Sequence, residues 1–291
     1  MPHLYDGIYI NLDRSADRRA RMEQQFAALG LSGLYRRLPA VDGATLPPRP
    51  GATPGERGVF RSHIAAIGLA AESGGPLHVL EDDAVLSPAT APAIDFCIQS
   101  SALGSFDIMF TETLVSQDVR ALKAFKALFD KATGGGANFD IRRLQIIDLT
   151  AVRFACTSSY VVNPKSAERL LDRLKVGWDK GPIQPIDFVL RDEVNNGRLR
   201  AACMFPFVTT IDPASIVSST TGRSAGSADD TASTLVLAVL RHSFFVGRDL
   251  AWAHARLAEI LARTVDRRPD SHRLLLEKAM GFVLSDHFQA F

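Results

Sequence analysis

The sequence predicts an α/β protein with a doubly wound, largely parallel sheet. Short apolar runs alternate along the chain with segments of helical periodicity, which is the pattern of strands connected by helices. The chain has 291 residues, of which 46% are hydrophobic and 22% charged, so it can bury a large core without metals or disulfides. We therefore expect one large domain followed by a smaller appendage.

The first strand and helix are the clearest elements. Gly7–Leu12 is a short apolar run typical of a buried strand. Ser15 is placed to cap a helix that runs to about residue 29, with Met22 and Phe26 on its buried face. Gly30 is expected to end this helix, because glycine is the preferred residue at that position.

The same order of strand and helix recurs further along the chain. Three more apolar runs have the composition of strands: Leu77–Leu80, Phe106–Phe110 and Ser159–Val162. After the last of them, Asn163 and Pro164 predict the cap and first residue of another helix.

A low-complexity stretch near residue 220 suggests the domain boundary. Residues 218–233 are small and polar and predict a flexible linker or loop. We expect the α/β domain to occupy residues 1–217 and a helical tail to occupy residues 234–291. The longest apolar run, Leu235–Leu240, is far too short to cross a bilayer.

Composition also narrows the class of function and the compartment. Lys plus Arg total 33 and Asp plus Glu total 32, so no nucleic-acid partner is expected. The three cysteines, none spaced as CxxC, predict neither disulfides nor a zinc site. With no secretory signal visible, we expect a cytoplasmic protein. The common sequence motifs of hydrolases, P-loop NTPases and dehydrogenases are also missing from the sequence.

Three adjacent carboxylates follow the apolar run Leu77–Leu80 directly. In an open α/β sheet, ligands bind beyond the carboxyl ends of the strands. If the extended geometry continues, Glu81 and Asp83 share one face, with Asp82 between them. Hard oxygen ligands at this spacing suit Mg²⁺ or Mn²⁺ shared with the phosphates of a nucleotide. The alternative is a solvated acidic turn.

The exit of the first strand carries the opposite charge. Asn11 and Leu12 lead into Arg14 and Arg18, which lie around the start of the predicted helix. Cations there oppose the helix dipole, and a bound diphosphate would remove the conflict. The alternative is that these arginines are solvated or paired with neighbouring acidic side chains.

Four other polar residues are candidates with simpler structural alternatives. Ser62 and His63 are expected at the opening of a helix, where a capping serine beside a structural histidine is the alternative. Glu112 follows the predicted strand Phe106–Phe110, where its carboxylate would reach a substrate hydroxyl. Asp187 begins another apolar segment, where the alternative is a helix cap.

Taken in order, seven segments resemble glycosyltransferase family 25. The matching segments are Ile8–Arg19, Arg37–Gly43, Glu56–His63, Leu77–Leu86, Phe110–Leu114, Thr157–Leu174 and Pro185–Leu190. They are spread over about residues 8–206 and do not reach the tail. One departure is that Cys156, Thr157 and Ser158 stand where family members often have glycine.

The resemblance implies a fold, a reaction and a set of ligands. The fold would be a GT-A-like Rossmann-type domain, and the reaction an inverting transfer from a UDP-sugar, with UDP-galactose as the expected donor. Asp83 and Glu81 would hold Mn²⁺ (or Mg²⁺) against the diphosphate. The other residues implicated in the donor site are Asn11, Leu12, Arg14, Arg18, Ser62, His63, Asp82 and Thr157. The acceptor would be a glycan or glycolipid such as lipopolysaccharide or another surface polysaccharide.

An inverting transfer also needs a general base for the acceptor hydroxyl. Glu81 and Asp83 are poor choices, because binding a metal lowers carboxylate basicity. We favour Asp187, which Pro185 restrains, and keep Glu112 as a contact to the donor sugar or an alternative base. The rival interpretation is a nucleotide-sugar-binding protein with impaired catalysis, which the departure at Ser158 supports; a phosphohydrolase fits less well.

The tail gives one expectation about location. Leu235, Val239, Phe245 and Leu250 would form an apolar surface beside several basic residues: Arg241, His242, Arg248, Arg256 and Arg263. A helix packed on the core with a basic outer face is one interpretation. Peripheral contact with the inner face of a membrane is the other.

Overall fold

A mixed seven-stranded sheet forms the centre of the molecule. The computed structural model describes residues 2–114, 119–134, 139–152, 154–180, 182–212 and 238–248, together with residues 251 and 255. The strand order is β2-β1-β3-β7-β5-β8-β6. In chain order these strands are β1 (Asp6–Asn11), β2 (Tyr35–Pro39), β3 (Leu77–Glu81), β5 (Ile108–Phe110), β6 (Gln145–Asp148), β7 (Ser159–Val162) and β8 (Ala201–Phe205). A second sheet pairs β4 (Ala84–Leu86) with β9 (Thr209–Ile211).

The strands of the large sheet do not all point the same way. β1, β2, β3, β5 and β8 share one direction, whereas β6 and β7 run against them. The expectation of a largely parallel sheet holds for β2-β1-β3, but β7 lies antiparallel between β3 and β5. Its four residues are all buried, so their pattern carries no information about direction. As a result, the start of β7 lies at the edge where β3 and β5 end.

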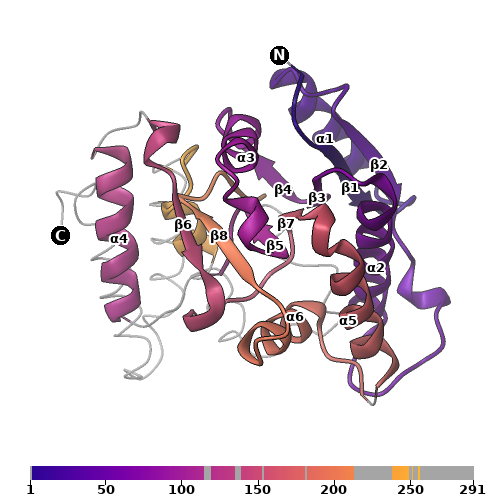
Figure 1. Cartoon of the computed structure of the whole chain (residues 1–291). Helices are drawn as coiled ribbons and strands as arrows, with labels where there is room; N and C mark the ends of the chain where they lie inside the picture. Colours follow the sequence, from indigo (N-terminus) through magenta and orange to yellow (C-terminus); the bar gives the residue numbers. More distant parts are fainter. Residues whose placement is uncertain are drawn as a thin grey trace, which may run out of the picture.

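Helices cover both faces of the sheet. They are α1 (Ala16–Ala28), α2 (Pro54–Ser73), α3 (Thr90–Gln99), α4 (Val119–Thr133), α5 (Ala167–Asp179) and α6 (Ile186–Asn195). Figure 1 shows α2, α5 and α6 on one side of the strands and α1 and α3 on the other. Side chains alternate between the two cores: Ile8 and Ile10 pack with α2 and α5, while Tyr9 packs with α1.

Local sequence signals explain where the first two helices begin and end. Gly30 has φ +71° and ends α1 as expected, although Ser15 makes no side-chain cap. α2 begins at Pro54, because Thr53 and Glu56 form a reciprocal capping box. Ser62 and His63 therefore lie in the middle of this helix, and the expectation that they open it is wrong.

Residues 238–248 pack against the core. Residues 238–243 are helical, and Val239 and Phe244 join the core on the α2 side. Phe207 N–H donates to the Phe244 carbonyl over 2.9 Å. Arg241 and His242 are buried here, so they do not form a basic outer face.

The rest of the C-terminal expectation is outside this part of the chain. The linker predicted at residues 218–233 and most of the tail predicted at 234–291, including Leu235, Leu250, Arg256 and Arg263, lie outside the described residues. Among the residues that are described, no helix is both long and apolar enough to span a membrane.

Close backbone packing on α2 gives a test of the fold. A Cβ atom on Gly58 would lie 2.6 Å from the Val41 carbonyl oxygen, whereas one on Gly68 would meet no atom within 4 Å. We expect Gly58→Ala to lower the free energy of unfolding by about 1–3 kcal/mol through overpacking. Gly68→Ala should raise it by up to about 1 kcal/mol through helix propensity. Urea unfolding measures both, and equal stability of the two variants would contradict this packing.

Candidate active site

The three carboxylates at the end of β3 have different surroundings: Glu81 is the last residue of the strand, and Asp82 and Asp83 form the turn that follows. Asp82 accepts hydrogen bonds from Asn11 Nδ2 (2.7 Å) and Arg18 Nη1 (2.9 Å). The strand exit of β1 and the first turn of α1 are thus tied directly to the acidic turn. Asn11 itself is buried and is fixed on the other side by Arg37 Nε, which donates to its Oδ1 over 3.0 Å.

Glu81 is held by a buried histidine and a threonine. His63 Nε2 lies 3.2 Å from Glu81 Oε1, and its Nδ1 lies 2.7 Å from the Tyr160 hydroxyl. Thr157 Oγ1 donates to the same Glu81 oxygen over 3.1 Å. Burial alone would raise the pKa of Glu81, but the contacts with His63 and Thr157 outweigh it and hold this pKa below its usual range.

Asp83 experiences the opposite balance. Its Oδ1 atom is buried, and Glu81 and Asp82 lie beside it. Burial, followed by repulsion from these two carboxylates, raises the pKa of Asp83 to about 7. A cation at this position would relieve the repulsion, which is the condition expected at a metal site.

Glu112 follows β5 and is fully buried, with 1% of its surface exposed. Arg241 forms a bidentate ion pair with the Glu112 carboxylate: Nε donates to Oε2 over 2.6 Å, and Nη2 contacts Oε1. The Ser158 hydroxyl also donates to Oε1. Sequence reasoning placed Arg241 on an outer surface and missed this contact, because nothing in the sequence links two residues 129 positions apart.

Asp187 lies in the first turn of α6 and contacts the segment that precedes β7. The Cys156 N–H donates to Asp187 Oδ2 over 3.3 Å, and the Phe188 N–H donates to Oδ1 over 3.0 Å. Burial raises the pKa of Asp187 above its ordinary value, against the effect of these hydrogen bonds. Cys156 has φ +89°, a conformation that suits glycine and strains other residues.

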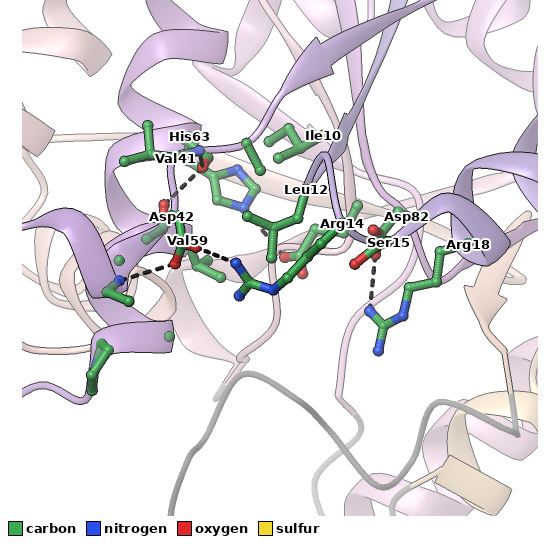
Figure 2. A pocket seen from close by; sticks show the side chains of 18 residues that line it. Ile10, Leu12, Arg14, Ser15, Arg18, Val41, Asp42, Val59, His63 and Asp82 are labelled. Carbon is green, nitrogen blue, oxygen red and sulfur yellow. Dashed lines mark hydrogen bonds and ion pairs between the residues drawn. The ribbon is translucent and has the colours of Figure 1, made fainter.

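A pocket of about 320 Å³ opens beside the acidic turn. Its apolar wall includes Ile10, Leu12, Val41 and Val59. Figure 2 shows His63, Asp82, Arg14 and Arg18 around the same cavity, with the Arg14–Asp42 and Arg18–Asp82 ion pairs at its rim. The pocket therefore combines an apolar wall with arginine and carboxylate side chains.

The predicted site residues fall into two connected groups. The first group lines the pocket and consists of Leu12, Arg14, Arg18, Ser62, His63, Glu81 and Asp82. Asn11 supports Asp82 from β1. Ser62 connects two parts of the pocket wall, because its hydroxyl accepts a hydrogen bond from Val41 N–H and donates one to the Gly58 carbonyl. Glu112 and Asp187 lie beyond the pocket, and the segment 156–158 connects them to Glu81.

The donor set fits a metal ion that is shared with a substrate. Within the described ranges, no group of three or more His, Cys, Asp or Glu side chains is arranged to hold a metal alone. Glu81 and Asp83 offer hard oxygen ligands, and Mg²⁺-type ions commonly bind one or two carboxylates together with substrate phosphates. The buried, mutually repelling carboxylates are the feature of this structure that supports such an ion.

An α/β sheet with an acidic strand end, beside a pocket that also carries two arginines, is typical of α/β proteins that bind ligands beyond the carboxyl ends of their strands. The family model described as glycosyltransferase family 25 (LPS biosynthesis protein) matches residues 6–190, which include all of these features except Arg241. The chain belongs to this family and is a glycosyltransferase. Comparison with curated proteins finds no significant match.

The raised pKa of Asp83 predicts how stability depends on pH. In the unfolded chain Asp83 ionises near 3.8, whereas in the folded protein its pKa is about 7, so this group costs stability as the pH rises through that range. Asp83→Asn should therefore raise Tm by a few °C at pH 8.5 and change it little below pH 4, with EDTA present.

Asp82→Asn is the matched control for this measurement. Because Asp82 is ion-paired with Arg18, its replacement should lower Tm at pH 8.5. Thermal scans of the three proteins at both pH values would decide. A fall in Tm for Asp83→Asn at pH 8.5 would contradict the electrostatic account of this turn.

Proposed function

We propose that the protein transfers galactose from UDP-galactose to a hydroxyl of a glycan or glycolipid acceptor, with inversion and with help from a divalent cation. Lipopolysaccharide or another surface polysaccharide is the acceptor class that the family description favours. The observation that carries the proposal is the placement of the 320 Å³ pocket directly against Glu81 and Asp82 at the end of β3. A nucleoside in this pocket would present its diphosphate to the acidic turn.

The pocket has an apolar wall and a charged rim, which match the two parts of a nucleotide donor. The apolar wall would cover one face of the base and ribose. Arg14 and Arg18 would interact with phosphate oxygens, since guanidinium groups match phosphate geometry. Arg18 is also bound to Asp82, so phosphate binding would be coupled to the position of the acidic turn.

Glu81 and Asp83 are the proposed ligands of Mn²⁺ or Mg²⁺. When bound, the ion would act as a Lewis acid that neutralises charge on the departing nucleoside diphosphate. Two residues of the protein prepare the site, since His63 and Thr157 hold Glu81 in its charged form. Groups that orient metal ligands in this way usually affect metal affinity strongly.

Asp187 is the proposed general base. Its pKa is raised by burial, which moves a carboxylate toward the value that suits proton transfer near neutral pH. Among the described residues, one long hydrogen bond of 3.3 Å from Cys156 N–H reaches its Oδ2. Glu112 is less suited to this role, because Arg241 and Ser158 already engage both of its oxygens. Glu112 is better explained as a support for the segment before β7.

The donor proposal predicts metal-dependent binding of UDP. By isothermal titration, UDP should bind in Mn²⁺ and bind roughly tenfold more weakly in EDTA, the loss expected for about 1.4 kcal/mol of ionic contact. Asp83→Asn should remove the difference while keeping the metal-free affinity. Lack of UDP binding under both conditions would contradict the donor assignment.

The base assignment predicts a separation of turnover from binding. Asp187→Asn should reduce the transfer of galactose to the acceptor, measured as UDP released, by about 10²–10⁴-fold, while UDP affinity stays unchanged. Glu112→Gln is the comparison variant. Near-normal turnover for Asp187→Asn, with turnover lost in Glu112→Gln and UDP still bound, would reverse the two roles.

The same turnover measurement tests the rival interpretation. A nucleotide-sugar-binding protein with impaired catalysis would bind UDP with Mn²⁺ yet release no product from UDP-galactose. Slow, metal-dependent hydrolysis of UDP-galactose by the wild-type protein would support the enzyme.

A further inference from the structure

The segment 238–248 places the charged side chain of Arg241 against Glu112 and the segment that precedes β7. Arg241 is 4% exposed and contacts two residues of the segment that precedes β7 as well as Glu112. Its Nη2 lies 3.3 Å from Cys156 Sγ and 3.2 Å from Ser158 Oγ. The family match ends at residue 190, so this arginine is contributed by a part of the chain outside it.

Arg241 and Glu112 both bind side chains of the segment 156–158. The same short segment also donates hydrogen bonds to two carboxylates of the proposed mechanism. Thr157 Oγ1 donates to Glu81, the proposed metal ligand, and Cys156 N–H donates to Asp187, the proposed base. A displacement of this segment would therefore move both carboxylates at once.

The backbone of this segment depends on its surroundings. Cys156 adopts φ +89°, which costs a non-glycine residue conformational energy and persists only where neighbouring contacts hold it. The grip on its side chain from Arg241 is one such contact. The Ser158 hydroxyl, bound to Glu112, fixes the segment two residues later.

The segment that carries Arg241 is itself firmly anchored. Phe207 N–H donates to the Phe244 carbonyl, and Val246 N–H donates to the Phe207 carbonyl, each over 2.9 Å. Val239 and Phe244 are buried in the core on the α2 side. Arg241 is therefore presented from a fixed backbone, as a positioning role requires.

We propose that Arg241 is a positioning residue of the active site, which acts through Glu112 and the segment 156–158 to hold Glu81 and Asp187 in working geometry. The proposal rests on the proposed function. It differs from a purely structural role, because a buried ion pair that only supports the fold can often be replaced by neutral residues without loss.

The test compares Arg241→Met with the double variant Glu112→Gln/Arg241→Met. The single variant leaves Glu112 buried without its partner and should lower Tm. The double variant removes both charges and should recover much of that Tm. Neither variant restores the contacts of Arg241 with Cys156 and Ser158. In both, kcat for UDP release from UDP-galactose with Mn²⁺ should therefore fall roughly 10–100-fold. The affinity for UDP in EDTA should stay unchanged, since Arg241 does not line the pocket.

Arg248→Met is the matched control from the same segment. Arg248 contacts the Ser243 carbonyl and the face of Phe129. Neither contact belongs to the acidic turn or to the segment 156–158, so turnover should stay at the wild-type value. Recovery of kcat together with Tm in the double variant would overturn the proposal, as would normal kcat in Arg241→Met. If wild-type protein binds no UDP, the proposed function has failed instead, and the two failures are distinguishable.

Discussion

Repulsion among carboxylates at one edge of the sheet is the constraint on which the rest of the site depends. Glu81 ends β3, Asp82 and Asp83 follow it directly, and Glu112 follows β5 two strands away. Arg18 neutralises Asp82 from α1, and Arg241 neutralises Glu112 from the C-terminal segment. Both arginines also act on Asp83, yet its pKa remains raised to about 7. A bound divalent cation would balance the remaining excess of negative charge.

The reversed direction of β7 turns this charge pattern into a site. Because β7 runs antiparallel between β3 and β5, residues 156–158 arrive at the edge where both neighbours end. Glu81 N–H donates to the Ser158 carbonyl over 2.8 Å, which continues the ladder into this segment. The same three residues then reach Glu81, Glu112 and Asp187 with their side chains and backbone. The strand that separates the two parallel parts of the sheet therefore connects the proposed metal site to the proposed base.

Much of the fold was predictable from local signals, whereas the long-range pairings were not. The apolar runs identified β1, β3 and β7 to within about one residue, because burial on both faces leaves a short, uninterrupted apolar pattern. The acidic turn after β3 was visible in the sequence as three adjacent carboxylates, but its ion pair with Arg18 was not predicted. The direction of β7 and the contact of Arg241 with Glu112 depend on tertiary packing, which leaves no signal at either position. The start of α2 was misjudged, although the capping pair Thr53 and Glu56 was present in the sequence.

Anomalous diffraction from crystals containing Mn²⁺ and UDP would show where the metal and the donor nucleotide bind. We expect one Mn²⁺ peak in contact with the Asp83 carboxylate and the diphosphate, with uridine in the pocket between the end of β1 and α2. We also expect the peak to be lost in Asp83→Asn crystals that still contain UDP. A Mn²⁺ peak away from the end of β3, or UDP bound outside this pocket, would contradict the account.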